Sequence, residues 1–166
     1  MVNKIYIVRH GITDCSKTPK TPNQNRDLEL NIEGIQQIES VGKYLKDCEI
    51  NTIYTDESKR TIESSQIIAA QLTEMAKIVI DNRLSNKDIN NNFKCNIRRL
   101  FNQVIQDENN DNICWVTHGR IIKLIYCYIQ NNGFPENIPK LTWCDYGCIS
   151  CIEVKDKKIQ PIYFGK

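Results

Sequence analysis

Residues 4–11 read KIYIVRHG, and this stretch decides the fold that the sequence predicts. Residues 5–8 form an unbroken run of β-branched and aromatic side chains. Such a run is typical of a strand buried on both faces, as in a parallel sheet covered by helices. The sequence therefore predicts a strand over residues 4–8, with the polar residues Arg9-His10-Gly11 directly after it.

Strand and helix patterns alternate along the rest of the chain. Short apolar runs predict further strands at 52–54, 78–80, 113–116, 148–154 and 159–163, the last two facing each other across a turn at 155–158. Apolar residues at helical spacing predict helices at 35–45, 62–72, 97–105 and 121–130, the last stopped by Asn131-Asn132-Gly133. We therefore expect one α/β domain over residues 1–166, with a mostly parallel central sheet and helices on both faces.

Composition and charge are those of an ordinary globular protein. The chain has 166 residues, of which 40% are hydrophobic and 25% charged, and its formal net charge is +2. This balance predicts neither a nucleic-acid nor a membrane partner. The apolar runs are far shorter than the ~20 residues of a membrane span, and the first residues lack the apolar stretch of a signal peptide. We expect a cytoplasmic protein, whose oligomeric state the sequence leaves open.

Eight cysteines raise the question of disulfides or a metal site. Without a secretory signal, we expect them to stay reduced and to pack as small apolar side chains. Cys144, Cys148 and Cys151 form a C-x3-C-x2-C run that could hold zinc. The spacing suits a strand better than a zinc knuckle, and no fourth ligand stands out. We therefore expect no metal.

The two histidines of the chain occur in matching contexts, Arg9-His10-Gly11 and Thr117-His118-Gly119. Each follows a predicted strand and precedes a glycine, which lets the backbone turn sharply. The alternative is two unrelated histidines satisfied by backbone carbonyls, and the repeated context disfavours it. In parallel sheets ligands bind beyond the carboxyl ends of the strands, so both histidines are candidates for one site.

Arg60 is expected at the same edge of the sheet as Arg9, near the start of the helix predicted at 62–72. The alternative is a solvated surface arginine. Two guanidinium groups at one edge would form a fork for phosphate, because their donors match phosphate geometry and their charge is permanent. Helix N-termini nearby would add backbone donors.

Four blocks in this order resemble the histidine phosphatase superfamily of phosphoglycerate-mutase-like enzymes: Arg9-His10-Gly11 with Thr13, DLELNIEGIQQ at 27–37, Ser58-Lys59-Arg60-Thr61 and Thr117-His118-Gly119. The resemblance runs over nearly the whole chain. It implies that His10 is a nucleophile that forms a phosphohistidine, which water then hydrolyses. It also implies that Arg9, Arg60, His118 and Gly119 bind the phosphoryl group, with no metal or cofactor, since the cations supply the positive field.

The chain departs from the family's pattern at three positions. Ile12 follows Arg-His-Gly where an acid is usual. Ser16 stands where several members carry an asparagine that contacts phosphate, and the resemblance implies that Ser16 binds phosphate in its place. Asn86 stands where many members carry the proton-donating glutamate, and an amide cannot act as a general acid. Asp88 is a candidate substitute acid, with a solvated or helix-capping carboxylate as an equal alternative.

These departures leave more than one function open. The leading prediction is a metal-independent, histidine acid-type phosphatase for a phosphomonoester, or for a phosphoramidate, whose good leaving group needs no acid. The alternatives are a catalytically weak pseudophosphatase that binds phosphorylated partners and a phosphoglycerate-type mutase. Residues 81–111 are shorter than the insertions with which the family's mutases enclose a small sugar acid. This favours hydrolysis of a phosphorylated metabolite or a phosphoprotein.

Overall fold

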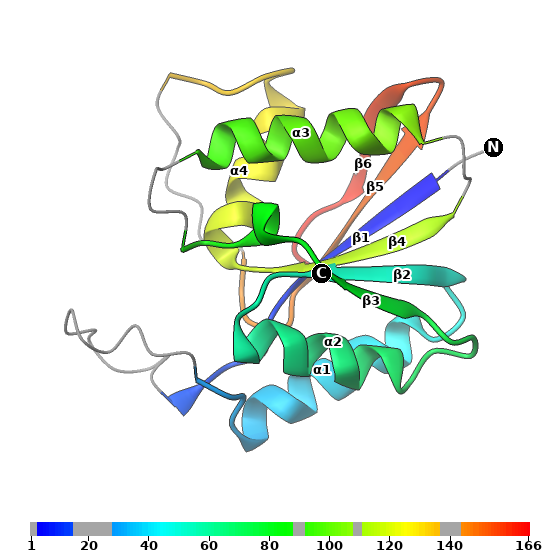
Figure 1. Ribbon diagram of the computed structural model, residues 1–166, viewed down its shortest axis with the longest axis vertical. Coiled ribbons are helices and arrows are strands. Elements are labelled where there is room, and N and C mark those ends of the chain that lie inside the picture. Colours follow the sequence, from blue (N-terminus) through cyan, green and yellow to red (C-terminus); the bar gives the residue numbers. More distant parts are fainter. Residues whose placement is uncertain (1–2, 15–27, 88–91, 108–110, 137–143) are drawn as a thin grey trace.

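The central sheet has six strands in the order β3-β2-β4-β1-β5-β6 (Figure 1). The computed structural model describes residues 3–14, 28–87, 92–107, 111–136 and 144–166. The strands are β1 Asn3–Arg9, β2 Ile50–Thr55, β3 Lys77–Ile80, β4 Asn112–Thr117, β5 Ile149–Lys155 and β6 Lys158–Tyr163. The first four are mutually parallel, β5 is antiparallel to β1, and β6 is antiparallel to β5. The predicted, mostly parallel sheet is confirmed.

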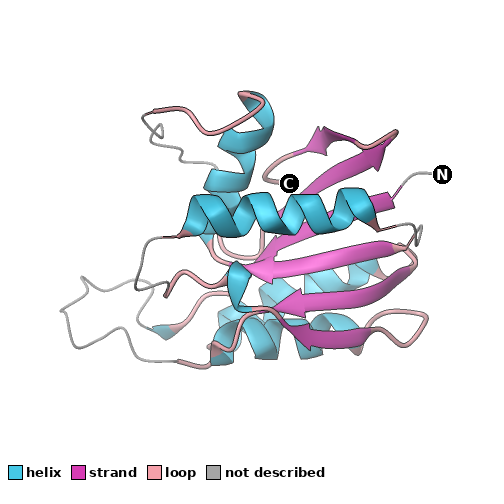
Figure 2. Cartoon of the chain, turned by 45° about the horizontal axis from the view of Figure 1, so that its top comes forward, coloured by secondary structure: helices cyan, strands magenta, loops and turns pink. Residues whose placement is uncertain are grey.

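Two layers of helices cover the sheet, as predicted (Figures 1 and 2). One face carries α1 (Ile32–Leu45) and α2 (Lys59–Ala69), and the other carries α3 (Phe93–Gln106) and α4 (Gly119–Gln130). A 3-10 turn, Asn82–Leu84, lies between β3 and α3 and was not predicted. Among the described residues, no helix is both long and apolar enough to cross a membrane.

Alternation along β1 explains why its sequence is apolar throughout. Ile5 and Ile7 pack into the core under α3 and α4, together with Trp115. Tyr6 and Val8 point the other way, into the core under α1 and α2. Both sets of side chains of a central strand are buried when helices cover both faces of the sheet. The unbroken apolar run at 5–8 is the sequence pattern of such a strand.

The β5–β6 hairpin turns as predicted, although the turn contains no glycine. Asp156 and Lys157 have φ angles of 51° and 59°, so both occupy the left-handed region. Consecutive left-handed residues form the turn that matches the right-handed twist of a two-residue hairpin. Strand β5 therefore ends at Lys155 and β6 begins at Lys158, so the turn is two residues shorter than the one predicted at 155–158.

Candidate active site

The carboxyl ends of β1, β4 and β2 bring the predicted residues together at one edge of the sheet. Arg9 is in register with Thr117, and the amide of His10 donates to the carbonyl of Thr117 at 3.1 Å. His10 and His118 therefore leave neighbouring strands side by side, with ring centroids 5.1 Å apart. The two matching sequence contexts mark one site.

Nδ1 of His10 is engaged in a hydrogen bond, and none of the residues that the structure describes bonds to Nε2. Its Nδ1 lies 2.7 Å from the carbonyl oxygen of Gly11, so Nδ1 carries the hydrogen and donates it. The lone pair is thereby left on Nε2. Burial is the largest cause that lowers the pKa of His10 well below its ordinary value, and the charges of His118 and Arg60 add to it. A neutral imidazole with a bare Nε2 is the nucleophilic form.

His118 is paired with a buried carboxylate that the sequence analysis missed. Its Nε2 lies 3.0 Å from Oδ2 of Asp56, a residue with 0% exposure. Asp56 also accepts hydrogen bonds from the hydroxyls of Ser58 and Thr61. Burial raises the pKa of Asp56, but the hydrogen bond from His118 and those from the two hydroxyls outweigh burial and hold the pKa below its ordinary value. The carboxylate is therefore charged and fixes the orientation of the His118 ring.

Arg60 approaches the other nitrogen of the same ring. Its Nη2 lies 3.4 Å from Nδ1 of His118, at the first turn of α2. With Nε2 donating to Asp56, Nδ1 is the acceptor for this arginine. Burial lowers the pKa of His118, and the carboxylate of Asp56 opposes the shift only in part. An arriving phosphoryl dianion would favour the protonated ring.

Arg9 has one buried donor without a partner among the described residues. Its Nη1 donates to the carbonyl of Cys144, and its guanidinium stacks on the ring of Tyr146 at 3.6 Å. Its Nε is buried and has no hydrogen-bond partner among the residues that the structure describes. A buried donor without a hydrogen bond is unfavourable, and an oxygen of a bound anion would be a suitable acceptor for it. A Cβ at Gly119 would lie 3.2 Å from this Nε, so a glycine at that position leaves the guanidinium room.

Two glycines hold the loop after β1 against the start of α1. A Cβ at Gly34 would lie 2.2 Å from the carbonyl oxygen of Ile12, and a Cβ at Gly11 would lie 2.5 Å from that of Gly34. The amide of Ile12 also donates to Oε1 of Gln37 at 3.1 Å. This close backbone approach explains why the segment at 27–37 belongs to the same pattern as Arg9-His10-Gly11.

We expect Gly34→Ala to destabilise the fold by about 1–3 kcal/mol, because its methyl group meets backbone rather than a flexible side chain. Urea unfolding followed by tryptophan fluorescence measures the change. Glu39→Ala, on the exposed face of the same helix, is the matched control and should shift the free energy of unfolding far less. Equal effects in the two variants would contradict the close-packing account.

The remaining predicted residues are distributed as follows. Ser16 and Asp88 lie outside the described residues. Asn86 is exposed. It lies two residues after Leu84, whose carbonyl accepts a 2.6 Å hydrogen bond from the hydroxyl of Thr117 at the end of β4. Asp56 could have been found from the sequence, because it lies just beyond the strand predicted at 52–54 and precedes a serine and a threonine with helix-capping spacing.

The cysteine run does not converge on a common point. Cys144 and Cys148 lie in the core under α3 and α4, whereas Cys151 packs on the opposite face of the sheet. Among the described residues, no group of three or more His, Cys, Asp or Glu side chains is placed to hold a metal ion.

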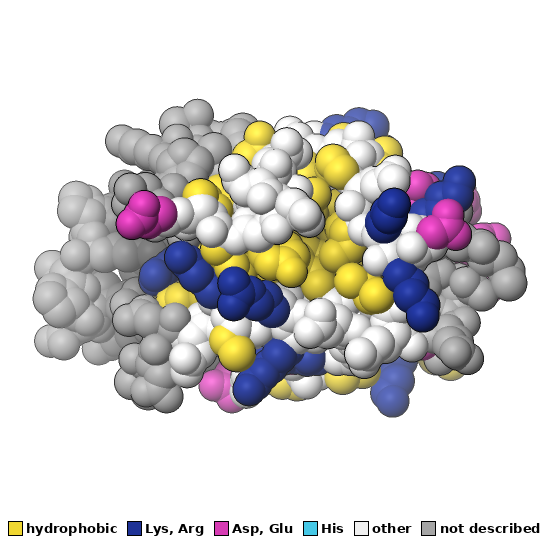
Figure 3. Space-filling model, turned by 90° about the horizontal axis from the view of Figure 1, so that it is seen from above, with side chains coloured by type: hydrophobic (Ala, Val, Ile, Leu, Met, Phe, Trp, Pro, Cys, Tyr) yellow, Lys and Arg dark blue, Asp and Glu magenta, His cyan; other side chains and the backbone are white. Residues whose placement is uncertain are grey.

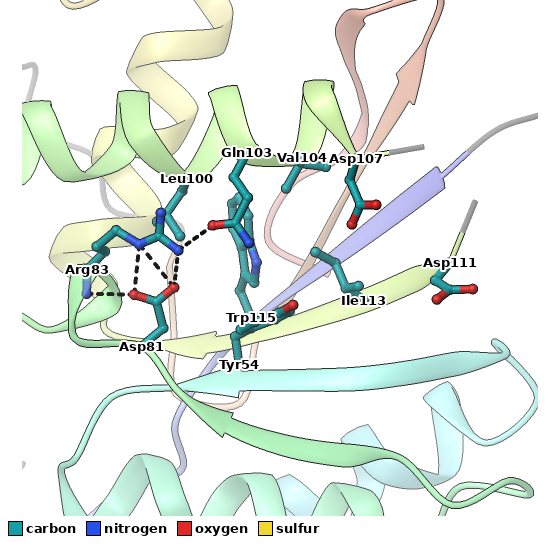
Figure 4. Close-up of a pocket in the computed structure, with 10 residues that line it drawn as sticks. All are labelled: Tyr54, Asp81, Arg83, Leu100, Gln103, Val104, Asp107, Asp111, Ile113 and Trp115. Carbon is teal, nitrogen blue, oxygen red and sulfur yellow. Dashed lines mark hydrogen bonds and ion pairs between the residues drawn. The ribbon is translucent and has the colours of Figure 1, made fainter. Parts of the chain in front are cut away.

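A separate pocket lies between α3 and the sheet, and neither histidine lines it (Figure 4). Arg83 and Asp81 form an ion pair at one end of it, and Arg83 also donates to Oε1 of Gln103 at 2.6 Å. The guanidinium of Arg83 is therefore engaged by Asp81 and Gln103, and the sheet edge that carries His10 and His118 remains the candidate active site.

The carboxyl edge of the sheet thus brings together a neutral imidazole, two arginines and a second histidine held by a buried carboxylate, an arrangement with the charge and the donors to bind an anion. The family model described as histidine phosphatase superfamily (branch 1) matches residues 5–92 and 89–164. The chain belongs to this superfamily, which confirms the resemblance seen in the sequence.

Individual relatives agree with this assignment. The chain is 37% identical over 64 residues to a protein of Danio rerio described as probable fructose-2,6-bisphosphatase TIGAR A, a match that covers 39% of this chain and 25% of that protein. The chain thus spans only part of the length of such curated relatives. Phosphoserine phosphatase from Entamoeba histolytica, in complex with 3-phosphoglyceric acid, has a similar fold, with a TM-score of 0.72, 21% identity, and coverage of 99% of this chain and 97% of that one. Phosphoglycerate mutase from Bacillus anthracis gives a TM-score of 0.79 at 15% identity, covering 99% and 93% of the two chains.

Proposed function

We propose that the protein is a phosphatase that hydrolyses a phosphomonoester, or a phosphoramidate, through a phosphohistidine on His10. The observation that carries this proposal is the hydrogen bond from Nδ1 of His10 to Gly11, which leaves Nε2 as the free nucleophile beside His118. Nε2 attacks phosphorus while the bond to the leaving group breaks. Water then displaces the histidine, which releases inorganic phosphate and restores the neutral ring.

The charge that develops on the phosphoryl oxygens would be held by Arg9, Arg60 and His118. The guanidinium groups stay charged at any working pH, so they can stabilise the transition state without a metal ion. The unpartnered Nε of Arg9 supports this role, because a phosphoryl oxygen would complete its hydrogen bonding.

The helices on one face of the sheet add positive charge to the molecule. Helices α3 and α4 carry basic side chains and no acidic ones, and Figure 3 shows Lys and Arg around an apolar patch on the face of the molecule seen from above. The basic residues are Lys94, Arg98, Arg99, Arg120 and Lys123. Such a field attracts anions. Because the relatives named above act on small phosphorylated metabolites, we propose a substrate of that class.

The first test is phosphate release from a panel of phosphorylated metabolites and phenyl phosphate, measured in the presence of a metal chelator. We expect turnover of at least one metabolite. Saturable binding without turnover would instead indicate a binding module. Interconversion of phosphoglycerates without net phosphate release would indicate a mutase.

We expect Asn86→Glu to accelerate hydrolysis of alkyl phosphates by roughly 10–100-fold, because a carboxylic acid can protonate a poor leaving group and the native amide cannot. Aryl phosphates, which leave readily, should change little. Asn86→Gln has the same length without the proton and serves as the control. If both variants hydrolyse alkyl phosphates at the parent's rate, Asn86 does not occupy the position of the acid.

A further inference from the structure

We propose that Cys144 and Cys148 form a reversible disulfide that weakens phosphate binding through Arg9. The two Sγ atoms lie 3.5 Å apart, and both residues are buried, with 3% and 6% exposure. A disulfide bond is about 2.0 Å long, so the thiols need to close by only about 1.5 Å. Cys151, the third member of the same run, packs on the other face of the sheet and takes no part.

The segment between the two thiols supports the catalytic end of β1. The carbonyl of Cys144 accepts the hydrogen bond from Nη1 of Arg9, and the ring of Tyr146 stacks on the same guanidinium. The amide of Gly147 donates to the carbonyl of Arg9 at 3.2 Å, and the amide of Arg9 donates to the carbonyl of Cys148 at 3.1 Å. A bond between the sulfurs therefore acts on the groups that position Arg9.

The two thiols differ in a way that suits sequential oxidation. The hydrogen bond from Cys148 is the largest cause that lowers the pKa of Cys144, and Arg9 lowers it further against the effect of burial. The same hydrogen bond, together with burial, raises the pKa of Cys148. Cys144 is therefore the thiol that ionises first and attacks an oxidant.

The oxidant is a hydroperoxide, here hydrogen peroxide. The thiolate of Cys144 attacks one peroxide oxygen, the O–O bond breaks, and the products are a sulfenic acid and, after protonation, water. The thiol of Cys148 then attacks the sulfur of the sulfenic acid, loses its proton, and expels a second water. Two thiols give up two electrons, and the peroxide is reduced to two molecules of water.

Closure of the disulfide draws the backbone of Cys144 toward Cys148, and so moves the carbonyl that holds Arg9 and the ring that stacks on it. Displacement of a positioning group by about 1 Å can cost up to 10²-fold in an active site. We expect oxidation to weaken binding of inorganic phosphate by roughly tenfold, and reduction to restore it. The accompanying loss of turnover rests on the proposed hydrolysis, and the weaker phosphate binding rests on the proposed contact of Arg9 with phosphate, whereas the disulfide itself rests on neither.

The experiment treats the reduced, purified protein with hydrogen peroxide and then measures three quantities. Mass spectrometry of the digest locates any linked peptides, calorimetry measures binding of inorganic phosphate, and phosphate release measures turnover. We expect a Cys144–Cys148 link, weaker phosphate binding, and recovery of both with dithiothreitol. Each variant is compared with its own untreated sample.

Cys148→Ser is expected to form no link and to lose the reversibility of the response, because the sulfenic acid then has no partner. Cys95→Ser, which removes an exposed thiol on α3, is the matched control and should respond as the parent does. Peroxide treatment that oxidises Cys95 but never links Cys144 to Cys148 would overturn the proposal, as would a link that leaves phosphate binding unchanged. A link that weakens phosphate binding in a protein with no turnover would uphold the inference while contradicting the proposed function.

Discussion

His10→Ala is expected to reduce phosphate release by roughly 10⁴-fold or more, because the alanine removes the atom that takes up the phosphoryl group. Binding of inorganic phosphate should fall far less, since Arg9, Arg60 and His118 remain. Measured together, initial rates on phenyl phosphate and calorimetric titration with phosphate separate the loss of chemistry from the loss of the pocket.

This variant must first be shown to be folded. His10 is 6% exposed, so a void at this position could also destabilise the protein, and urea unfolding must show that the variant is folded under the assay conditions. A folded His10→Ala variant that hydrolyses phenyl phosphate as fast as the parent would mean that another group attacks phosphorus.

Asp56→Asn is expected to slow turnover by roughly 10²-fold and to change its dependence on pH. The amide has the same shape as the carboxylate but lacks the charge that opposes the lowering of the His118 pKa. Without that charge, His118 releases its proton at a lower pH. If the protonated ring binds the phosphoryl group, the decline of activity on the alkaline side moves to lower pH in the variant. Profiles of kcat/KM against pH report this shift.

Asp81→Asn is the matched control for this change. Asp81 is also a shielded carboxylate after a parallel strand, and it pairs with Arg83 away from the histidines. Its replacement should lower stability without moving the alkaline side of the pH profile. A purely structural role for Asp56 predicts that the two variants behave alike, and that result would contradict the assignment of Asp56 as the residue that positions His118.

The sequence predicted the strands of the sheet well because the central ones are apolar on both faces. It placed the helix starts too late, at residues 35, 62 and 97. The first turn of α2, Lys59-Arg60-Thr61, is polar and shows no apolar period, whereas α3 begins at Phe93, a buried residue in phase with Ile97 that the prediction missed. Helix α1 instead begins at Ile32, a residue with 77% exposure, where the side chain of Asn31 accepts from the amide of Gly34 at 2.9 Å. The 3-10 turn at Asn82–Leu84 is too short to show any period.

Some residues of the candidate site could likewise be predicted from the sequence, and others could not. The sequence could predict which residues lie at the carboxyl edge of the sheet, because each of them follows a strand or begins a helix. They are Arg9, His10, Arg60 and His118. Their partners could not all be predicted. Cys144 and Tyr146 reach Arg9 from a segment more than a hundred residues along the chain, and only the antiparallel pairing of β5 with β1 brings them there.

The phosphoryl group that we propose on His10 during turnover can be trapped by stopping the reaction before water displaces it. The protein is mixed with phenyl phosphate, quenched rapidly in base, digested with trypsin, and the peptide HGITDCSK at residues 10–17 is analysed by mass spectrometry. The account predicts a base-stable, acid-labile phosphoryl group on His10, formed during a burst of phenol release. A burst with the phosphoryl group on another residue, or steady turnover with an unmodified His10 peptide at every quench time, would contradict it.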